Sequence, residues 1–136
     1  QWCMEQRAHV IEYLQREKVT HGEVGEWPAW HVAPYVSIWA IESKKNRGWV
    51  GWWAICGDLP TDYVSAASIK HPREALMAFG ESWRRKSILM SKGTGSPRTV
   101  GFPKENWAEL APLLKARAKI LLEWAKDDSV WGRPRI

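Results

Sequence analysis

The stretch that decides the fold is Tyr35-Val-Ser-Ile-Trp-Ala-Ile-Glu-Ser43, followed by the polar turn Lys44–Gly48 and by Trp49-Val-Gly-Trp-Trp-Ala-Ile-Cys-Gly-Asp58. The two outer segments are rich in β-branched and aromatic residues, which favour strands. A short polar turn that ends in glycine usually joins neighbouring antiparallel strands. The stretch therefore predicts a β-hairpin made of these two segments.

The hairpin strands carry apolar side chains on both faces, so we expect a cover on one face and a partial cover on the other. With Ser43 opposite Trp49, Trp39 lies opposite Trp53. A direct aromatic pair of this kind adds about 0.2–1 kcal/mol relative to an alanine pair. Tyr63–Ala67 is expected to add a short third strand.

Helical spacing of apolar residues predicts one helix before the hairpin and two after it. The first spans residues 2–18, the second runs from Pro72 to about residue 91, and the third spans residues 104–126. Pro112 lies inside the third pattern and is expected to break or kink it. The expected fold is α+β: an N-terminal helix, an antiparallel β-hairpin with a short third strand, and two C-terminal helices packed on the sheet, in a single domain spanning residues 1–136.

Tryptophan is the compositional anomaly, since 11 of the 136 residues are Trp and only 2 are Phe. An indole has a large apolar surface and one N–H that needs a partner when it is buried. So many indoles predict a core with internal polar contacts or a surface made for binding. Gly22–His31 carries two of them beside two glycines and a proline, which predicts an ordered loop packed on the domain.

The two cysteines, Cys3 and Cys56, lie in a helical and a strand pattern, and both are expected to be buried, reduced thiols. This use of cysteine favours a reducing compartment, so we expect a cytoplasmic protein. No apolar run approaches the ~18 residues needed to span a membrane. The sequence therefore predicts no membrane association.

The net charge of +5 is unevenly distributed along the chain. Residues 1–69 carry 6 basic and 8 acidic side chains, whereas residues 70–136 carry 14 basic and 7 acidic ones. Such asymmetry is typical of an anion-binding face or of solvated helix surfaces. Nucleic-acid binding is the third functional hypothesis, ranked last because the tryptophans lie in the acidic half and no nucleic-acid motif is present. The candidate anion-binding residues are Arg73, Arg84, Arg85, Lys115 and Lys119.

The second hypothesis is an enzyme, or a small-ligand or metal-binding protein, with a cluster beside an aromatic pocket. Histidines and carboxylates hold zinc or iron and act in acid–base catalysis. Their spacing here matches no standard ligand pattern, and turn capping is the alternative, so no catalytic residue, metal ligand or cofactor is assigned. Cys56 ends an apolar strand, which favours a structural thiol over a nucleophile. The cluster consists of His21, His31, Asp58 and Asp62.

The first hypothesis is a small non-enzymatic binding module that recognises a protein partner, as an adaptor, an inhibitor or an immunity-type factor. Exposed Trp and Tyr side chains are typical interface anchors. The tryptophans of the loop and hairpin would form the contact surface, with glutamates at its rim. The candidate partner- or ligand-binding residues are Glu23, Glu26, Trp27, Trp30, His31, Trp49, Trp52, Asp58 and Asp62.

Two long tryptophan-rich strings, Gly25–Ser43 and Gly51–Tyr63, carry a resemblance together with Trp2-Cys3 and His71-Pro-Arg-Glu-Ala75. They resemble a small bacterial family of uncharacterised proteins, a domain of unknown function, and the likeness covers nearly the whole chain. The resemblance brings no established activity, cofactor or catalytic residue. It implies a stand-alone bacterial protein.

Overall fold

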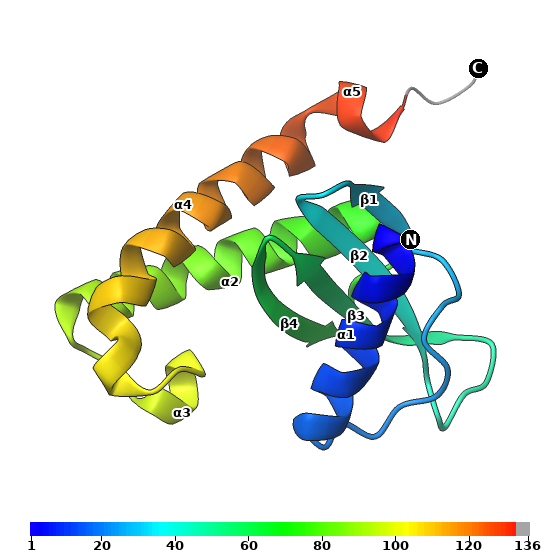
Figure 1. Ribbon diagram of the computed structural model, residues 1–136, viewed down its shortest axis with the longest axis horizontal. Coiled ribbons are helices and arrows are strands. Elements are labelled where there is room, and N and C mark those ends of the chain that lie inside the picture. Colours follow the sequence, from blue (N-terminus) through cyan, green and yellow to red (C-terminus); the bar gives the residue numbers. More distant parts are fainter. Residues whose placement is uncertain (133–136) are drawn as a thin grey trace. The chain divides into compact units, whose positions relative to one another are not determined.

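The computed structural model describes residues 1–132 (Figure 1). The chain divides into two compact units, Gln1–Leu76 and Met77–Ile136. The N-terminal unit holds helix α1 (Trp2–Arg16) and a four-stranded antiparallel sheet, whereas the described part of the C-terminal unit is helical. The α+β fold is confirmed, and the single-domain organisation stays a prediction.

The sheet consists of four strands that follow one another in space as they do along the chain, each antiparallel to its neighbour. The predicted hairpin is confirmed as its two central strands. A fourth strand, β1, precedes the hairpin at a place where the sequence predicts only loop. The strands are β1 (Trp30–Val32), β2 (Val36–Glu42), β3 (Val50–Gly57) and β4 (Leu59–Ser65).

The segment before β1 is ordered, as predicted, because it runs beside β2 and shares backbone hydrogen bonds with it. Gly22 N–H donates to the Glu42 carbonyl at 2.8 Å, and Gly25 N–H donates to the Ala40 carbonyl at 3.0 Å. Ala29 N–H donates to a β2 carbonyl at 2.8 Å. Three residues of regular strand are too few for an alternating pattern to show in the sequence, which explains why β1 was not predicted.

The predicted register of the hairpin is wrong by one residue. Ser43 N–H donates to the Trp49 carbonyl at 2.8 Å, as the turn requires. A β-bulge then shifts the pairing, and Trp39 lies opposite Ala54 rather than opposite another indole. Gly51 permits the bulge, since a Cβ built on it would stand 2.8 Å from the Cα of Ser43.

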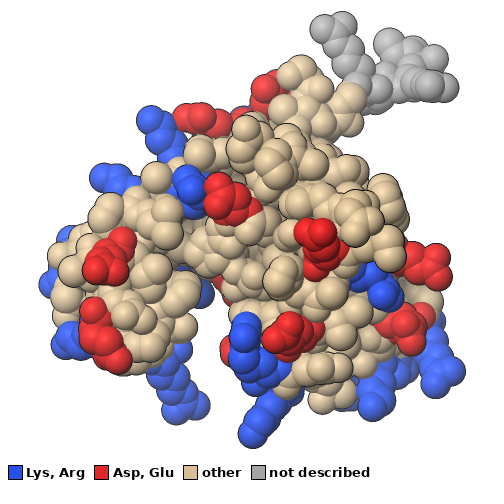
Figure 2. All heavy atoms as spheres, viewed as in Figure 1, with Lys and Arg blue, Asp and Glu red and all other residues tan. Residues whose placement is uncertain are grey.

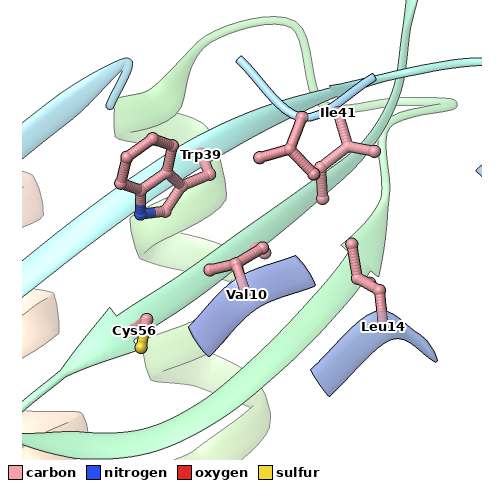
Figure 3. Packing of buried hydrophobic residues seen from close by; sticks show 7 residues of the cluster. Val10, Leu14, Trp39, Ile41 and Cys56 are labelled. Carbon is pink, nitrogen blue, oxygen red and sulfur yellow. The ribbon is translucent and has the colours of Figure 1, made fainter. Parts of the chain in front are cut away.

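The core of the N-terminal unit lies between α1 and one face of the sheet (Figure 3). Val10 and Leu14 project from α1 towards β2, Val10 on the side of Trp39 and Leu14 on the side of Ile41. The buried Trp39 indole N–H donates to the Ser37 hydroxyl at 2.8 Å, and that hydroxyl donates to the Cys56 carbonyl at 2.9 Å. The indole is thereby fully satisfied in an apolar setting, which is the internal polar contact expected of a Trp-rich core.

The third predicted strand begins earlier than expected, at Leu59, and ends at Ser65. The chain reverses at Gly57 and Asp58, where Gly57 has φ +152°. A Cβ at Gly57 would stand 2.2 Å from the Tyr35 carbonyl oxygen, so only glycine fits. The reversal is confined to Gly57 and Asp58, so residues 59–62 already belong to β4.

The C-terminal part of the chain is a series of helices. Pro112 does not break α4, because a proline inside a helix removes one backbone hydrogen bond while the remaining bonds hold the helix together. No helix among residues 1–132 combines the length and apolar character needed to cross a membrane. The helices are α2 (Pro72–Lys92), α3 (Pro97–Val100), the 3₁₀ helix η1 (Lys104–Asn106), α4 (Trp107–Lys126) and α5 (Asp128–Trp131).

Candidate functional site

Three rings from three places in the sequence meet at the β1 side of the N-terminal unit. The His31 ring contacts two indoles: its centroid is 6.2 Å from that of Trp2 and 6.2 Å from that of Trp27. The Trp27 ring stands at 89° to the imidazole, an edge-to-face arrangement. Trp27 is 61% exposed, so the indole offers most of its surface to solvent. We call these three side chains the aromatic face.

The backbone that carries Trp27 is held on both sides. Gly25 and Ala29 are bonded to β2, and Pro28 between them is buried. From α1, the Arg7 guanidinium donates to the carbonyls of Gly25 and Val24, each at 2.9 Å. The exposed indole is therefore fixed to a rigid framework rather than carried on a mobile loop.

The other predicted tryptophans lie elsewhere in the N-terminal unit. Trp30 is half-buried and pairs with Ile38, so strand alternation places it on the sheet face opposite His31. Trp49 is 73% exposed, in the β2–β3 turn at the other end of β2 from His31. About five strand residues separate these two ends, or roughly 17 Å. Trp52 is half-buried against the core, and its indole N–H donates to the Thr20 carbonyl at 3.1 Å.

The predicted histidine and carboxylate cluster is not assembled into a metal site. Within residues 1–132 no group of three or more His, Cys, Asp or Glu side chains is placed to hold a metal ion. His21 Nδ1 donates to the Gly22 carbonyl at 2.6 Å, close to Glu42 at the end of β2 far from His31. Asp58 is exposed in the chain reversal, and the half-buried Asp62 accepts a 2.8 Å hydrogen bond from the next backbone N–H.

The glutamates of the predicted rim, Glu23 and Glu26, are both exposed. Glu26 directly precedes Trp27, so a carboxylate lies beside the aromatic face in the chain. Glu23 lies earlier in the loop, where its carbonyl accepts the Glu42 N–H at 2.8 Å. Of the two, Glu26 is the nearer to Trp27 in the sequence.

Cys56 lies in β3, and its thiol is buried. Cys3 and Cys56 are both free and buried, as predicted. Burial raises the pKa of the Cys56 thiol, and a 3.5 Å hydrogen bond from the Thr61 hydroxyl opposes that shift only in part. A raised thiol pKa leaves little thiolate at neutral pH, so Cys56 has the properties of a packing residue rather than a nucleophile.

A second ring cluster belongs to the core side of the sheet. The Tyr63 ring lies 5.6 Å from the Trp52 ring and 6.0 Å from the Tyr13 ring, both edge-to-face. Burial raises the pKa of the Tyr13 hydroxyl, and the carboxylates of Asp62 and Glu17 add to the shift. These rings join α1 to the sheet and contribute to packing more than to a surface.

The C-terminal unit carries a groove that gathers three of the five candidate anion-binding residues. It has a volume of about 600 Å³ and is lined from α2 by Arg84 and from α4 by a stripe that includes Lys115 and Lys119. Arg73 and Arg85 are not among the residues that line it. The sequence analysis did not predict this stripe as one surface, although its members follow one another at spacings of three and four residues, which place them on one side of a helix. The remaining lining residues are Pro112, Ala116, Leu122, Glu123 and Lys126.

Charged side chains do not gather in one patch on the face that Figure 2 shows. On the face that Figure 2 shows, acidic and basic side chains are interspersed and much of the surface is uncharged. A mixed surface of this kind leaves specificity to local contacts, which makes the aromatic face and the groove the two features with a distinct chemistry.

Comparison with protein families gives one result. A family model described as "Domain of unknown function (DUF4826)" matches residues 1–131. The match covers almost the whole chain, so the chain belongs to this family, and the predicted resemblance to an uncharacterised family is confirmed. Searches of curated proteins and of solved structures give no match.

Proposed function

We propose that this member of the DUF4826 family is a protein-binding module whose contact surface is the aromatic face. The observation that carries the proposal is Trp27, an indole that is 61% exposed although the backbone on both sides of it is anchored. Large rigid aromatic side chains are the commonest energetic anchors of protein interfaces. Unlike the exposed Trp49, the indole of Trp27 stands beside His31, which also contacts Trp2, and such a group of rings suits a protein partner.

Anchoring of the loop strengthens this proposal through entropy. A partner that binds a mobile loop must first order it, and ordering costs about 0.5–1.5 kcal/mol for each immobilised side chain. Here Arg7 and the β2 backbone have already fixed the segment around Trp27. Glu26 adds a carboxylate beside the indole, which favours a partner with an apolar pocket and a basic group at its edge.

Placement in a bacterial cytoplasm belongs to the same proposal. Its support is the pair of buried free thiols, Cys3 and Cys56, which suit a reducing compartment.

The test is affinity capture from native lysate of the source organism, using the wild-type chain and Trp27→Ala. We expect the wild type to retain one protein, and the variant to bind it about thirtyfold more weakly, as for a residue worth about 2 kcal/mol. The matched control is Trp49→Ala, which removes an indole that is also exposed but lies at the other end of β2.

Two results would contradict the proposal. One is the absence of any specifically retained protein. The other is a captured protein that binds wild type, Trp27→Ala and Trp49→Ala equally well, which would place the contact outside the aromatic face. Thermal unfolding of each variant, run in parallel, separates loss of binding from loss of fold.

A further inference from the structure

The groove of the C-terminal unit is long enough to hold a short helix. Its α4 wall is one stripe from Pro112 to Lys126, with members three or four residues apart. These fourteen residue steps correspond to about 21 Å at the rise of an α-helix, or roughly four turns. The lining residues Lys115, Ala116 and Lys119 are exposed, so the groove is open along its length rather than enclosed.

The apolar part of the groove is held firmly in place. A Cβ built on Gly80 of α2 would stand 2.8 Å from the Cδ2 atom of Leu122 on α4. The two helices therefore approach closely at this point, and Leu122 has little freedom to move. Pro112 and Ala116 continue the apolar surface along α4.

The rim of the groove carries more positive than negative charge. Within residues 1–132, the side-chain ammonium groups of Lys115, Lys119 and Lys126 make no hydrogen bond or ion pair. Arg84 is paired with Glu81 at 3.1 Å, and Glu123 is the one carboxylate among the described residues that line the groove. Residues 77–136 carry twelve basic and six acidic side chains, a net of +6. A ligand that neutralised these lysines would therefore carry negative charge.

These observations distinguish between classes of occupant. Single-stranded nucleic acid binds by stacking on aromatic rings, and none of the described residues that line the groove is aromatic. Small apolar ligands need a site that buries most of their surface, which an open groove does not. An amphipathic helix buries one apolar stripe and leaves its other face in water, so an open apolar floor with a basic rim suits a helix of acidic character.

We propose that this groove docks an acidic amphipathic helix of a partner protein, with the apolar stripe of that helix on Pro112, Ala116 and Leu122. Its carboxylates pair with Lys115, Lys119 and Lys126. The proposal does not depend on the aromatic face, which lies in the other unit of the chain.

The experiment uses the full chain and a fluorescein-labelled, helix-stapled peptide of about 15 residues, a length that matches the groove. Leucines form one stripe of the peptide and glutamates flank it, and a stapled peptide of the same composition in scrambled order is the control. Fluorescence anisotropy should show the patterned peptide binding at least tenfold more tightly than the scrambled one. The double variant Lys115→Glu with Lys119→Glu should weaken that binding at least tenfold.

The matched charge control is Lys44→Glu with Lys45→Glu, which makes the same change in net charge at the exposed β2–β3 turn. This control and Trp27→Ala should both bind the patterned peptide as the wild type does. Equal binding of patterned and scrambled peptides, or no binding, overturns the proposal. Groove-dependent binding of a single-stranded oligonucleotide or of anionic phospholipid vesicles that exceeds peptide binding overturns it too, in favour of those occupants.

Discussion

Trp39 and Trp27 carry the same side chain in the same unit, and the structure gives them opposite environments. Trp39 is 0% exposed on a central strand, with its indole N–H bonded to Ser37. Trp27 is 61% exposed on a segment whose backbone is bonded to that same strand. The difference teaches that the indole of Trp27 is exposed although its backbone segment is hydrogen-bonded to the sheet, so exposure does not require a loop detached from the fold.

The largest test of this contrast is removal of the buried indole. Trp39→Ala should destabilise the protein by about 3–5 kcal/mol, because it leaves a cavity in the core and removes the N–H that donates to the Ser37 hydroxyl. Urea unfolding followed by circular dichroism measures the loss.

The companion change, Trp27→Ala, should alter the free energy of unfolding by no more than about 0.5 kcal/mol, as is usual for an exposed position. A loss above about 2 kcal/mol for Trp27→Ala would show that this indole contributes to the framework, and would weaken its assignment to a contact surface.

A second test makes the same contrast with two glycines, one in a close contact within the sheet and one in an open turn. Gly57→Ala should cost more than about 2 kcal/mol, because the new Cβ would meet the Tyr35 carbonyl and the backbone has positive φ. Gly48→Ala should cost about 1 kcal/mol, because Gly48 also has positive φ but faces open space. Thermal unfolding of both variants checks the order, and equal losses would mean that φ alone, without the close contact, sets the cost.

Residue patterns were enough to predict the elements that bury the most side chains. The hairpin, α1 and the first long C-terminal helix follow from strand-forming and helical patterns, and the reduced state of Cys3 and Cys56 follows from their positions in them. Local pattern works here because each element hides one continuous apolar face.

Register and site assembly could not be predicted, because single close approaches decide them. The bulge depends on the fit of Gly51 against Ser43, and a polar turn of the same length without a bulge would have paired Trp39 with another indole. The aromatic face joins Trp2 to His31 across a long stretch of sequence, a contact that exists only once α1 has docked on the sheet. Such features arise from tertiary contacts, which a local sequence pattern does not predict.

The smallest expected effect on stability comes from Tyr13, which is half-buried and so lies between the buried environment of Trp39 and the exposed one of Trp27. Burial raises the pKa of its hydroxyl above the ordinary value of 10.0, so the unfolded chain loses this proton at a lower pH than the folded chain does. Tyr13 therefore contributes stability that is fully present below pH 10 and is lost as the pH rises above it. Between about pH 8 and about pH 11, wild type should lose up to about 1 kcal/mol more stability than Tyr13→Phe, as measured by urea unfolding at both pH values. Tyr35→Phe, which changes an exposed tyrosine, should track the wild type. If Tyr13→Phe lost as much stability as the wild type between these pH values, the Tyr13 hydroxyl would be as well solvated as an exposed one. Tyr13 would then lie outside the core.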